Sequence, residues 1–272
     1  MISLLFVIFL FGLCLGSFLN VCIYRLPREQ SVVGGRSYCP GCERTISWHD
    51  NIPLLSYLIL LGRCRYCDEK ISFRYFIVEL LSGLAVTLSA FYWLFLPDKP
   101  HWFNFVAYSY LILVSLAIFF VDFEFSIIPN ELSYALIITG LAAGFFTHAP
   151  LSTGRISFVP QQFWWSLAGF LVGGIIFLVL ALVSPLIYGQ SALGMGDVKL
   201  IAGYGAWMGP QAALFIIIAG SLIGAIVGSA LMFYRGKSLR NEIPFGPFLC
   251  LAAVFYLFWG AELVSWYVGL FS

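Results

Sequence analysis

Eight apolar segments alternate with short polar stretches along the chain. Seven of them are long enough for an α-helix to cross a bilayer, which takes about 20 residues at a rise of about 1.5 Å each. Segment 198–208 is shorter and needs a tilted or broken helix. The apolar positions run on without the alternation of a transmembrane β-barrel. The pattern predicts an all-α polytopic membrane protein with eight transmembrane helices, near residues 3–24, 75–96, 104–121, 132–148, 163–186, 198–208, 211–234 and 246–270.

Composition supports this class of protein. The 272 residues are 61% hydrophobic and 10% charged, whereas soluble domains are about 45–50% apolar and about 25% charged. A soluble globular domain is therefore excluded. The first segment lacks a basic leader region and is long enough to span, so we expect a membrane helix there and not a cleaved signal peptide.

The charges are concentrated in one insert. Eight of the fourteen basic residues lie between Arg25 and Arg74, beside five acidic ones. A second basic stretch holds Arg235, Lys237 and Arg240. With eight crossings both stretches lie on the same side of the membrane, and an excess of Lys and Arg marks the cytoplasmic side. We therefore predict three parts: a first transmembrane helix at 1–24, a water-exposed cytoplasmic loop at 25–74 and a transmembrane core at 75–272.

The cytoplasmic loop contains two C-x-x-C pairs, "CPGC" with Cys39 and Cys42 and "CRYC" with Cys64 and Cys67. Two such pairs separated by 21 residues suit a tetrahedral zinc ion. Four cysteine ligands leave no open coordination position, so the predicted zinc is structural. The alternatives are redox-active dithiols or disulfides, and a cytoplasmic location disfavours stable disulfides.

Two carboxylates lie at the edges of apolar segments. Asp122 ends one segment in "AIFFVDFEF", and Asp197 opens another in "GMGDVKL". In the predicted topology both reach the cytoplasmic membrane edge at the same depth, where two neighbouring carboxylates share a proton because they cannot both ionise easily. One can then act as a base toward water while the other polarises a carbonyl. Taken singly, Asp197 could cap its helix and Asp122 could mark the interface. Gly194 and Gly196 would let a peptide lie close to Asp197.

Several separated motifs, taken in order, resemble those of the type IV prepilin peptidases, membrane aspartic proteases of the GxGD type. The similar stretches cover most of the chain: "GSFLNVCIYRLP" at 16–27, the two C-x-x-C pairs, "ISFRYFIVELLSG" at 71–83, "VDFEFSIIPN" at 121–130, "GMGDVKL" at 194–200 and "PFGPFL" at 244–249.

The resemblance implies a function and a location. It implies that Asp122 and Asp197 are the catalytic pair of an endopeptidase in the bacterial inner membrane, which cuts prepilins or pseudopilins after a glycine on the cytoplasmic side. It also implies methylation of the new N-terminus with S-adenosylmethionine, because the four-cysteine loop is associated with bifunctional members. No residue is assigned to the methyl donor, and no nucleic-acid partner is expected. A peptidase without methyltransferase activity is the first alternative.

One position departs from the family pattern, because Asn130 follows Pro129 where the family commonly has an aspartate. Since Asp122 matches the catalytic position, we expect full activity, with Asn130 capping the next helix. Lys199, Glu124 and Glu131 are weaker substrate-binding candidates, the two glutamates for a basic leader. A transporter that relays protons through the same aspartates is the alternative of a different class; it predicts carboxylates at mid-membrane and an inverted repeat, and the sequence shows neither.

Overall fold

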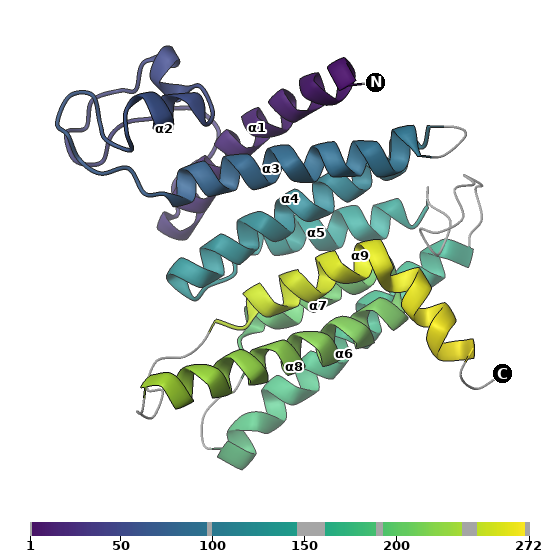
Figure 1. Ribbon diagram of the computed structural model, residues 1–272. Coiled ribbons are helices and arrows are strands. Elements are labelled where there is room, and N and C mark those ends of the chain that lie inside the picture. Colours follow the sequence, from purple (N-terminus) through teal and green to yellow (C-terminus); the bar gives the residue numbers. More distant parts are fainter. Residues whose placement is uncertain (1, 97–99, 146–160, 189–192, 236–243, 270–272) are drawn as a thin grey trace. The chain divides into compact units, whose positions relative to one another are not determined.

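The computed structural model describes residues 2–96, 100–145, 161–188, 193–235 and 244–269, and helices dominate these ranges (Figure 1). Each of the eight apolar segments contains a helix, so the predicted all-α fold is confirmed. Among the described residues, five helices are long and apolar enough to cross a membrane: Ile2–Arg28, Arg74–Phe95, Trp102–Phe125, Phe163–Leu186 and Pro210–Leu231. The count of eight crossings is thus not confirmed. Lys237 and Arg240, on which the orientation partly depends, lie outside the described residues.

The chain divides into two compact units, residues 1–117 and 118–272, and α4 (Trp102–Phe125) passes from one into the other. The first unit also contains α1 (Ile2–Arg25), η1 (Leu26–Arg28), η2 (Trp48–Asn51), α2 (Leu55–Ile59), α3 (Arg74–Ala90) and the π-helical turn η3 (Phe91–Phe95). The three predicted parts, with boundaries at residues 24 and 74, were drawn by expected function, whereas the two units are defined by compactness. The three-part division therefore stays a prediction.

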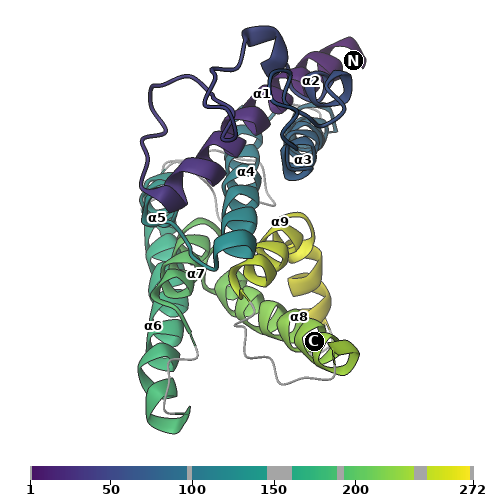
Figure 2. The same cartoon turned by 90° about the vertical axis from the view of Figure 1, so that its left-hand side faces the viewer.

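In the first unit, α1 and α3 lie side by side (Figures 1 and 2). Glycines allow the two backbones to approach closely: a Cβ on Gly12 would lie 2.9 Å from the Cα of Gly83, and one on Gly16 would lie 2.7 Å from the Cα of Glu79. Small residues at helix contacts are typical of membrane proteins, where packing and not the hydrophobic effect drives helix association. The polar loop at 26–73 is therefore held between the ends of a closely packed helix pair.

The second unit consists of the end of α4 together with five helices: α5 (Asn130–Ala143), α6 (Gln161–Tyr188), α7 (Met195–Met208), α8 (Pro210–Arg235) and α9 (Gly246–Gly269). Helix α7 contacts all of α5, α6, α8 and α9. Its side chains Leu200, Ile201 and Tyr204 are fully buried. With 14 residues, α7 is about 21 Å long and shorter than the hydrocarbon core of about 30 Å. Protein surrounds this short helix, which explains why segment 198–208 is apolar without being long enough to span.

The contact between α6 and α7 is made by backbone atoms. A Cβ on Gly169 would overlap the carbonyl oxygen of Gly205, and a Cβ on Gly205 would overlap that of Gly169. Close by, the buried Ser166 hydroxyl donates to the carbonyl oxygen of Ala206 at 2.5 Å. On the opposite side, a Cβ on Gly203 would lie 2.8 Å from Leu136 of α5. The glycines of α7 thus set its distance from both neighbours.

We expect Gly169→Ala to destabilise the second unit, because the added methyl group has no space between α6 and α7. Overpacking of this kind typically costs about 1–3 kcal/mol. Gly174→Ala, on the same helix, is the matched control, since its Cβ would lie at an ordinary 3.4 Å from Ala202. Thermal unfolding in detergent should show a lower midpoint for Gly169→Ala alone. Equal midpoints for the two variants would contradict the proposed packing.

Candidate active site and cysteine cluster

Asp122 lies in the last turn of α4 and is 5% exposed. Its backbone carbonyl accepts the N–H of Ser126 at 2.8 Å, where the chain leaves the helix with a positive φ of 54°. Its side-chain Oδ2 accepts the backbone N–H of Gly246 at 2.9 Å. Gly246 is the first residue of α9, and a Cβ there would lie 2.7 Å from the same oxygen. The start of α9 therefore fixes the orientation of the Asp122 carboxylate.

Asp197 lies in the first turn of α7. Its Oδ2 accepts the backbone N–H of Gly194 at 3.2 Å, and its own N–H donates to the Gly194 carbonyl at 3.1 Å. Asp197 is therefore not the cap residue that was considered: Gly194 occupies the cap position, and Asp197, the third residue of α7, bonds the backbone of that cap. A carboxylate in the first turn also interacts favourably with the partial positive charge of a helix N-terminus. The hydrogen bond from Gly194 occupies one carboxylate oxygen and does not exclude a chemical role for the other.

The two aspartates lie near each other. Their carboxylates are close enough for their charges to repel, and the buried Cys250 of α9 lies within electrostatic range of both. Ile128, in the link between α4 and α5, joins the two sides of the site. A Cβ on Gly196 would lie 2.9 Å from the Ile128 side chain, and a Cβ on Gly246 would lie 3.2 Å from it. The structure therefore places the end of α4 and the starts of α7 and α9 around one pair of carboxylates.

Gly246 and Ile128 were not predicted as site residues. Gly246 occurs in "PFGPFL", a stretch noted only for its similarity to a family motif. Its contact with Asp122 joins residues 124 positions apart. A Gly-Pro pair directly before an apolar segment is the one available sequence signal. Gly196 also gains a packing role that was not predicted, because Ile128 fills the space beside it.

Lys199 and Asn130 form a contact of their own. The Lys199 ammonium donates to Asn130 Oδ1 at 2.6 Å and lies 5.0 Å from the centre of the Tyr134 ring. Asn130 was predicted to cap a helix, but it is the first helical residue of α5, and the cap position is occupied by Pro129. The Asn130 side chain therefore accepts a hydrogen bond from Lys199 of α7 and does not cap the backbone of α5.

The remaining weak candidates are exposed. Glu124 lies in the last turn of α4 and Glu131 in the first turn of α5, and both are solvent-accessible. Gly194 is exposed as well, as is Met195 beside it. Glu124 shares α4 with Asp122, Gly194 and Met195 lie at the start of α7 beside Asp197, and Glu131 lies on the neighbouring helix α5.

The four cysteines of the loop form one cluster, whose Sγ atoms all lie within 4.8 Å of one another. The sulfurs of Cys39 and Cys67 are 3.7 Å apart. Tetrahedral coordination with zinc–sulfur bonds of about 2.3 Å requires sulfur–sulfur distances of about 3.8 Å. Backbone N–H groups of Tyr66 and Cys67 lower the pKa of the Cys64 thiol to about 7, which favours the thiolate that binds metals. The cluster can hold a metal ion.

The two C-x-x-C turns have the same local geometry. In the first, the Cys39 N–H donates to the Arg44 carbonyl and the Cys39 carbonyl accepts from Glu43; in the second, Cys64 pairs in the same way with Glu69 and Asp68. Glu43 and Asp68 both have a positive φ, near 60°. An isolated β-bridge closes each turn, Tyr38 with Thr45 and Arg63 with Lys70. The repeat of one turn conformation explains why each pair presents its two sulfurs in the same way.

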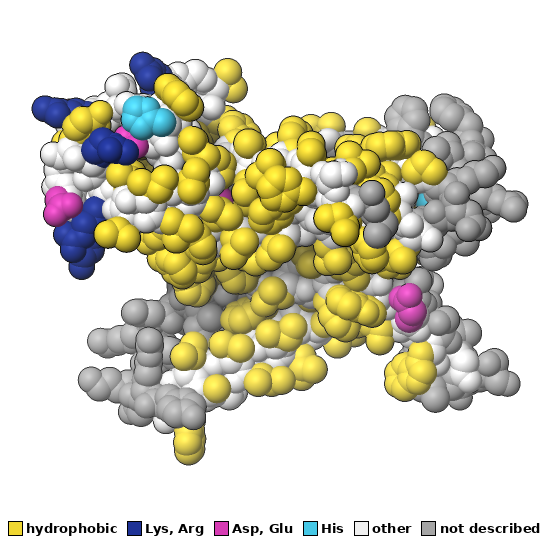
Figure 3. Space-filling model, turned by 45° about the horizontal axis from the view of Figure 1, so that its top comes forward, with side chains coloured by type: hydrophobic (Ala, Val, Ile, Leu, Met, Phe, Trp, Pro, Cys, Tyr) yellow, Lys and Arg dark blue, Asp and Glu magenta, His cyan; other side chains and the backbone are white. Residues whose placement is uncertain are grey.

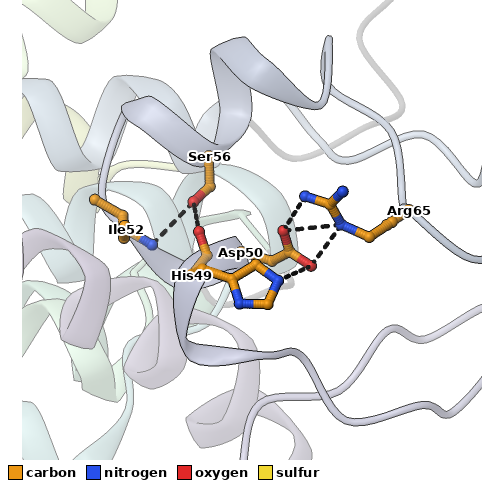
Figure 4. Close-up of polar contacts among 5 residues, drawn as sticks. All are labelled: His49, Asp50, Ile52, Ser56 and Arg65. Carbon is orange, nitrogen blue, oxygen red and sulfur yellow. Dashed lines mark hydrogen bonds and ion pairs between the residues drawn. The ribbon is translucent and has the colours of Figure 1, made fainter.

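Arg65, in the second C-x-x-C turn, ties this turn to η2 (Figure 4). Its guanidinium donates to both oxygens of Asp50, at 2.6 Å from Nη2 and 3.0 Å from Nε. The hydrogen bonds from Arg65 hold the pKa of the Asp50 carboxyl below its usual value. The Ser56 hydroxyl then links η2 to α2, because it donates to the His49 carbonyl and accepts the Ile52 N–H, both at 2.9 Å. The cysteine cluster and α2 thus belong to one hydrogen-bonded loop.

Family models match both parts of the chain. The bacterial peptidase A24 N-terminal domain matches residues 10–93, and the type IV leader peptidase family matches residues 109–229. A relative in Aeromonas salmonicida is 34% identical over 288 residues, which cover 96% of this chain and 93% of that protein. The chain belongs to the type IV leader peptidase family. The resemblance inferred from the motifs is therefore confirmed.

Other members of the type IV leader peptidase family match over a similar length. The chain is 33% identical to a Legionella pneumophila protein, with 97% of this chain and 94% of that one covered. It is 33% identical to a Vibrio cholerae protein, with 91% and 93% covered. All three relatives are named prepilin leader peptidase/N-methyltransferase. No solved structure matches the chain.

Proposed function

We propose that this chain removes the leader from type IV prepilins or pseudopilins and methylates the new N-terminus, with Asp122 and Asp197 as the catalytic pair. Family membership supports both activities, since the relatives are named for both. The observation that supports the catalytic assignment is the mutual approach of the two carboxylates where α4, α7 and α9 meet. The cysteine-bearing N-terminal part supports the second activity.

The proposed cleavage is a general acid–base hydrolysis without a covalent intermediate. One aspartate takes a proton from a water molecule, which attacks the carbonyl carbon of the leader glycine. The other, protonated, donates its proton to the carbonyl oxygen. Collapse of the tetrahedral intermediate breaks the C–N bond, and the leaving amine takes up a proton. One oxygen of each carboxylate is hydrogen-bonded to a backbone N–H, of Gly246 or Gly194, so both side chains are held in place with an oxygen left for this chemistry.

The substrate and the location follow from the same assignment. Glu124 and Glu131 are exposed carboxylates on the elements flanking Asp122, and they suit a basic leader peptide. The excess of basic residues between α1 and α3 supports a cytoplasmic position for the loop, in the bacterial inner membrane.

S-adenosylmethionine would supply a methyl group from its sulfonium sulfur to the new terminal amine. Zinc held by Cys39, Cys42, Cys64 and Cys67 would be structural.

A proton- or cation-coupled transporter is not favoured. That class places carboxylates near mid-membrane, whereas Asp122 is in the last turn of its helix and Asp197 is in the first turn of another. The family and the named relatives are peptidases.

Asp122→Asn and Asp197→Asn should each abolish cleavage of a purified prepilin, because neither amide can exchange the proton. Loss of a general acid or base typically costs about 10²–10⁴-fold in rate. Glu262→Gln, a change at an exposed carboxylate of α9, is the control that should cleave normally. The shift of the substrate band on a gel measures the rate. Wild-type cleavage by either aspartate variant would exclude the pair as catalytic.

Gly246→Ala should lower kcat more than it raises KM, because the new methyl group would displace the Asp122 carboxylate or the start of α9. Small displacements of catalytic groups can cost about 100-fold. Gly174→Ala is again the matched control. Kinetics over a range of prepilin concentrations separates the two constants. An unchanged kcat would show that the Gly246 contact does not position Asp122.

The purified chain should contain about one zinc ion, since a closed Cys₄ site binds a single ion. Cys42→Ser and Cys64→Ser should lose the metal and make the loop between α1 and α3 more sensitive to proteolysis, because metal binding supplies folding energy. Cys14→Ser, at an exposed cysteine of α1, should keep it. Elemental analysis of the detergent-solubilised protein measures the content. Retained zinc in the loop variants would contradict the assignment.

A further inference from the structure

The loop between α1 and α3 is not polar throughout. Ten successive residues, Ile52 to Leu61, carry no charge and are apolar except for Pro53 and Ser56. They include α2. Several of their large apolar side chains are exposed although the loop lies outside the candidate spans: Leu55 by 50%, Leu58 by 58%, Ile59 by 65% and Leu61 by 85%.

The exposed side chains share one face of α2. Leu55, Leu58 and Ile59 are spaced three and four residues apart, which places them together on a helix. The opposite side is occupied by contacts within the loop and with α3: Ser56 is buried and bonded to His49 and Ile52, and Tyr57 packs on aromatic rings. Helix α2 is therefore amphipathic, with an apolar face that the described residues of its own unit leave uncovered. In the space-filling view, hydrophobic side chains lie among the charged ones of this loop (Figure 3).

The segment runs antiparallel to the first turns of α3. At its start, the Leu54 N–H donates to Glu79 Oε2 at 2.8 Å. In the middle, the Tyr57 ring lies 5.6 Å from that of Phe76. At its end, the Gly62 carbonyl accepts the Ile71 N–H at 2.8 Å. Three contacts in register thus align residues 54–62 with residues 79–71.

This alignment sets the depth of α2. Helix α3 begins a candidate membrane span at Arg74, so Glu79 lies about 7.5 Å further along the helix axis. The Leu54 N–H bonds the Glu79 carboxylate, whose side chain leans toward the start of the helix, so Leu54 lies beside the first turns of this span. Amphipathic helices at membrane surfaces bury their apolar faces about 5–10 Å into the boundary between headgroups and acyl chains. In this register α2 faces residues 78–74, the first turns of the candidate span, which is where the boundary region would lie.

Glu79 keeps the segment at that level. Glu79 is 8% exposed, and its carboxylate also hydrogen-bonds the Ser17 hydroxyl of α1. Leu54 has a positive φ of 60°, a conformation that is costly for a leucine. The hydrogen bond from Leu54 to Glu79 compensates for this backbone strain, and through Glu79 it joins the start of α2 to α3 and α1.

We propose that residues 52–61 form a membrane-surface element whose exposed face, Leu55, Leu58 and Ile59, inserts into the lipid bilayer. The occupant of this face is phospholipid, because the segment is fixed alongside the outer turns of a membrane-spanning helix. Through Ser56, η2 and the Asp50–Arg65 ion pair, the same element holds the cysteine cluster at the membrane surface. The loop predicted to be wholly water-exposed is thus in part an interfacial structure.

The test uses the full chain in nanodiscs of phosphatidylethanolamine and phosphatidylglycerol. The photoreactive residue p-benzoylphenylalanine replaces, one at a time, Leu58 or Ile59 of the exposed face. Leu84, an exposed position within the α3 span, is the positive control, and Arg44, an exposed residue of the first C-x-x-C turn, is the water-facing control. After irradiation, mass spectrometry of the intact protein should show a gain of one phospholipid at positions 58, 59 and 84 and none at 44.

Three outcomes would overturn the proposal. Positions 58 and 59 could remain unmodified while position 84 gains lipid, which would place α2 in water. A covalent dimer on a denaturing gel would assign the face to a second copy of the chain. Cross-linked peptides from residues 118–272 would show that the rest of the chain covers it. None of these readouts depends on peptidase or methyltransferase activity, so the result is independent of the proposed function.

Discussion

Backbone contact between α6 and α7 is the constraint on which the aspartate site depends. Because Gly169 and Gly205 lack side chains, the two helices touch through their carbonyl groups. This fixes α7 at the centre of the second unit, with α5, α8 and α9 around it. Asp197 is then presented at the start of a helix that cannot shift, beside the end of α4. A charged group at this position needs such rigidity, since an aspartate pair functions only within a narrow range of distances.

Backbone N–H groups do much of the orienting at both sites. Gly246 and Gly194 each donate to one oxygen of an aspartate, and N–H groups of the second C-x-x-C turn surround the Cys64 sulfur. Backbone donors are held by the helices and turns to which they belong, so they lose little conformational freedom in making these bonds. Glycine is needed at position 246 for a steric reason, because the donor must approach the carboxylate more closely than a Cβ permits.

Local patterns could be predicted from the sequence to a large extent. The apolar segments form helices because their length and hydrophobicity favour one structure in a membrane. Each C-x-x-C pair adopts the same tight turn, which depends on a few neighbouring residues, and the spacing of the two pairs predicted that they share one metal site. Asp122 and Asp197 were found as a pair because both interrupt apolar runs at their ends. The short segment 198–208 was recognised as unable to cross alone, although its burial within the unit could not be foreseen.

The sequence by itself determined the helices, the two C-x-x-C turns and the candidate aspartates, since each depends on periodicity, length or spacing within a short stretch. Only the tertiary structure decided what these groups contact. Gly246 reaches Asp122 across 124 positions, Lys199 meets Asn130 across 69, and Leu54 binds Glu79 across 25. Helix packing decides such contacts, because it depends on the shapes of surfaces far apart in the chain. The apolar stretch from Ile52 to Leu61 belongs to the loop predicted to be water-exposed, and its alignment with α3 supports the proposal that it lies at the membrane surface.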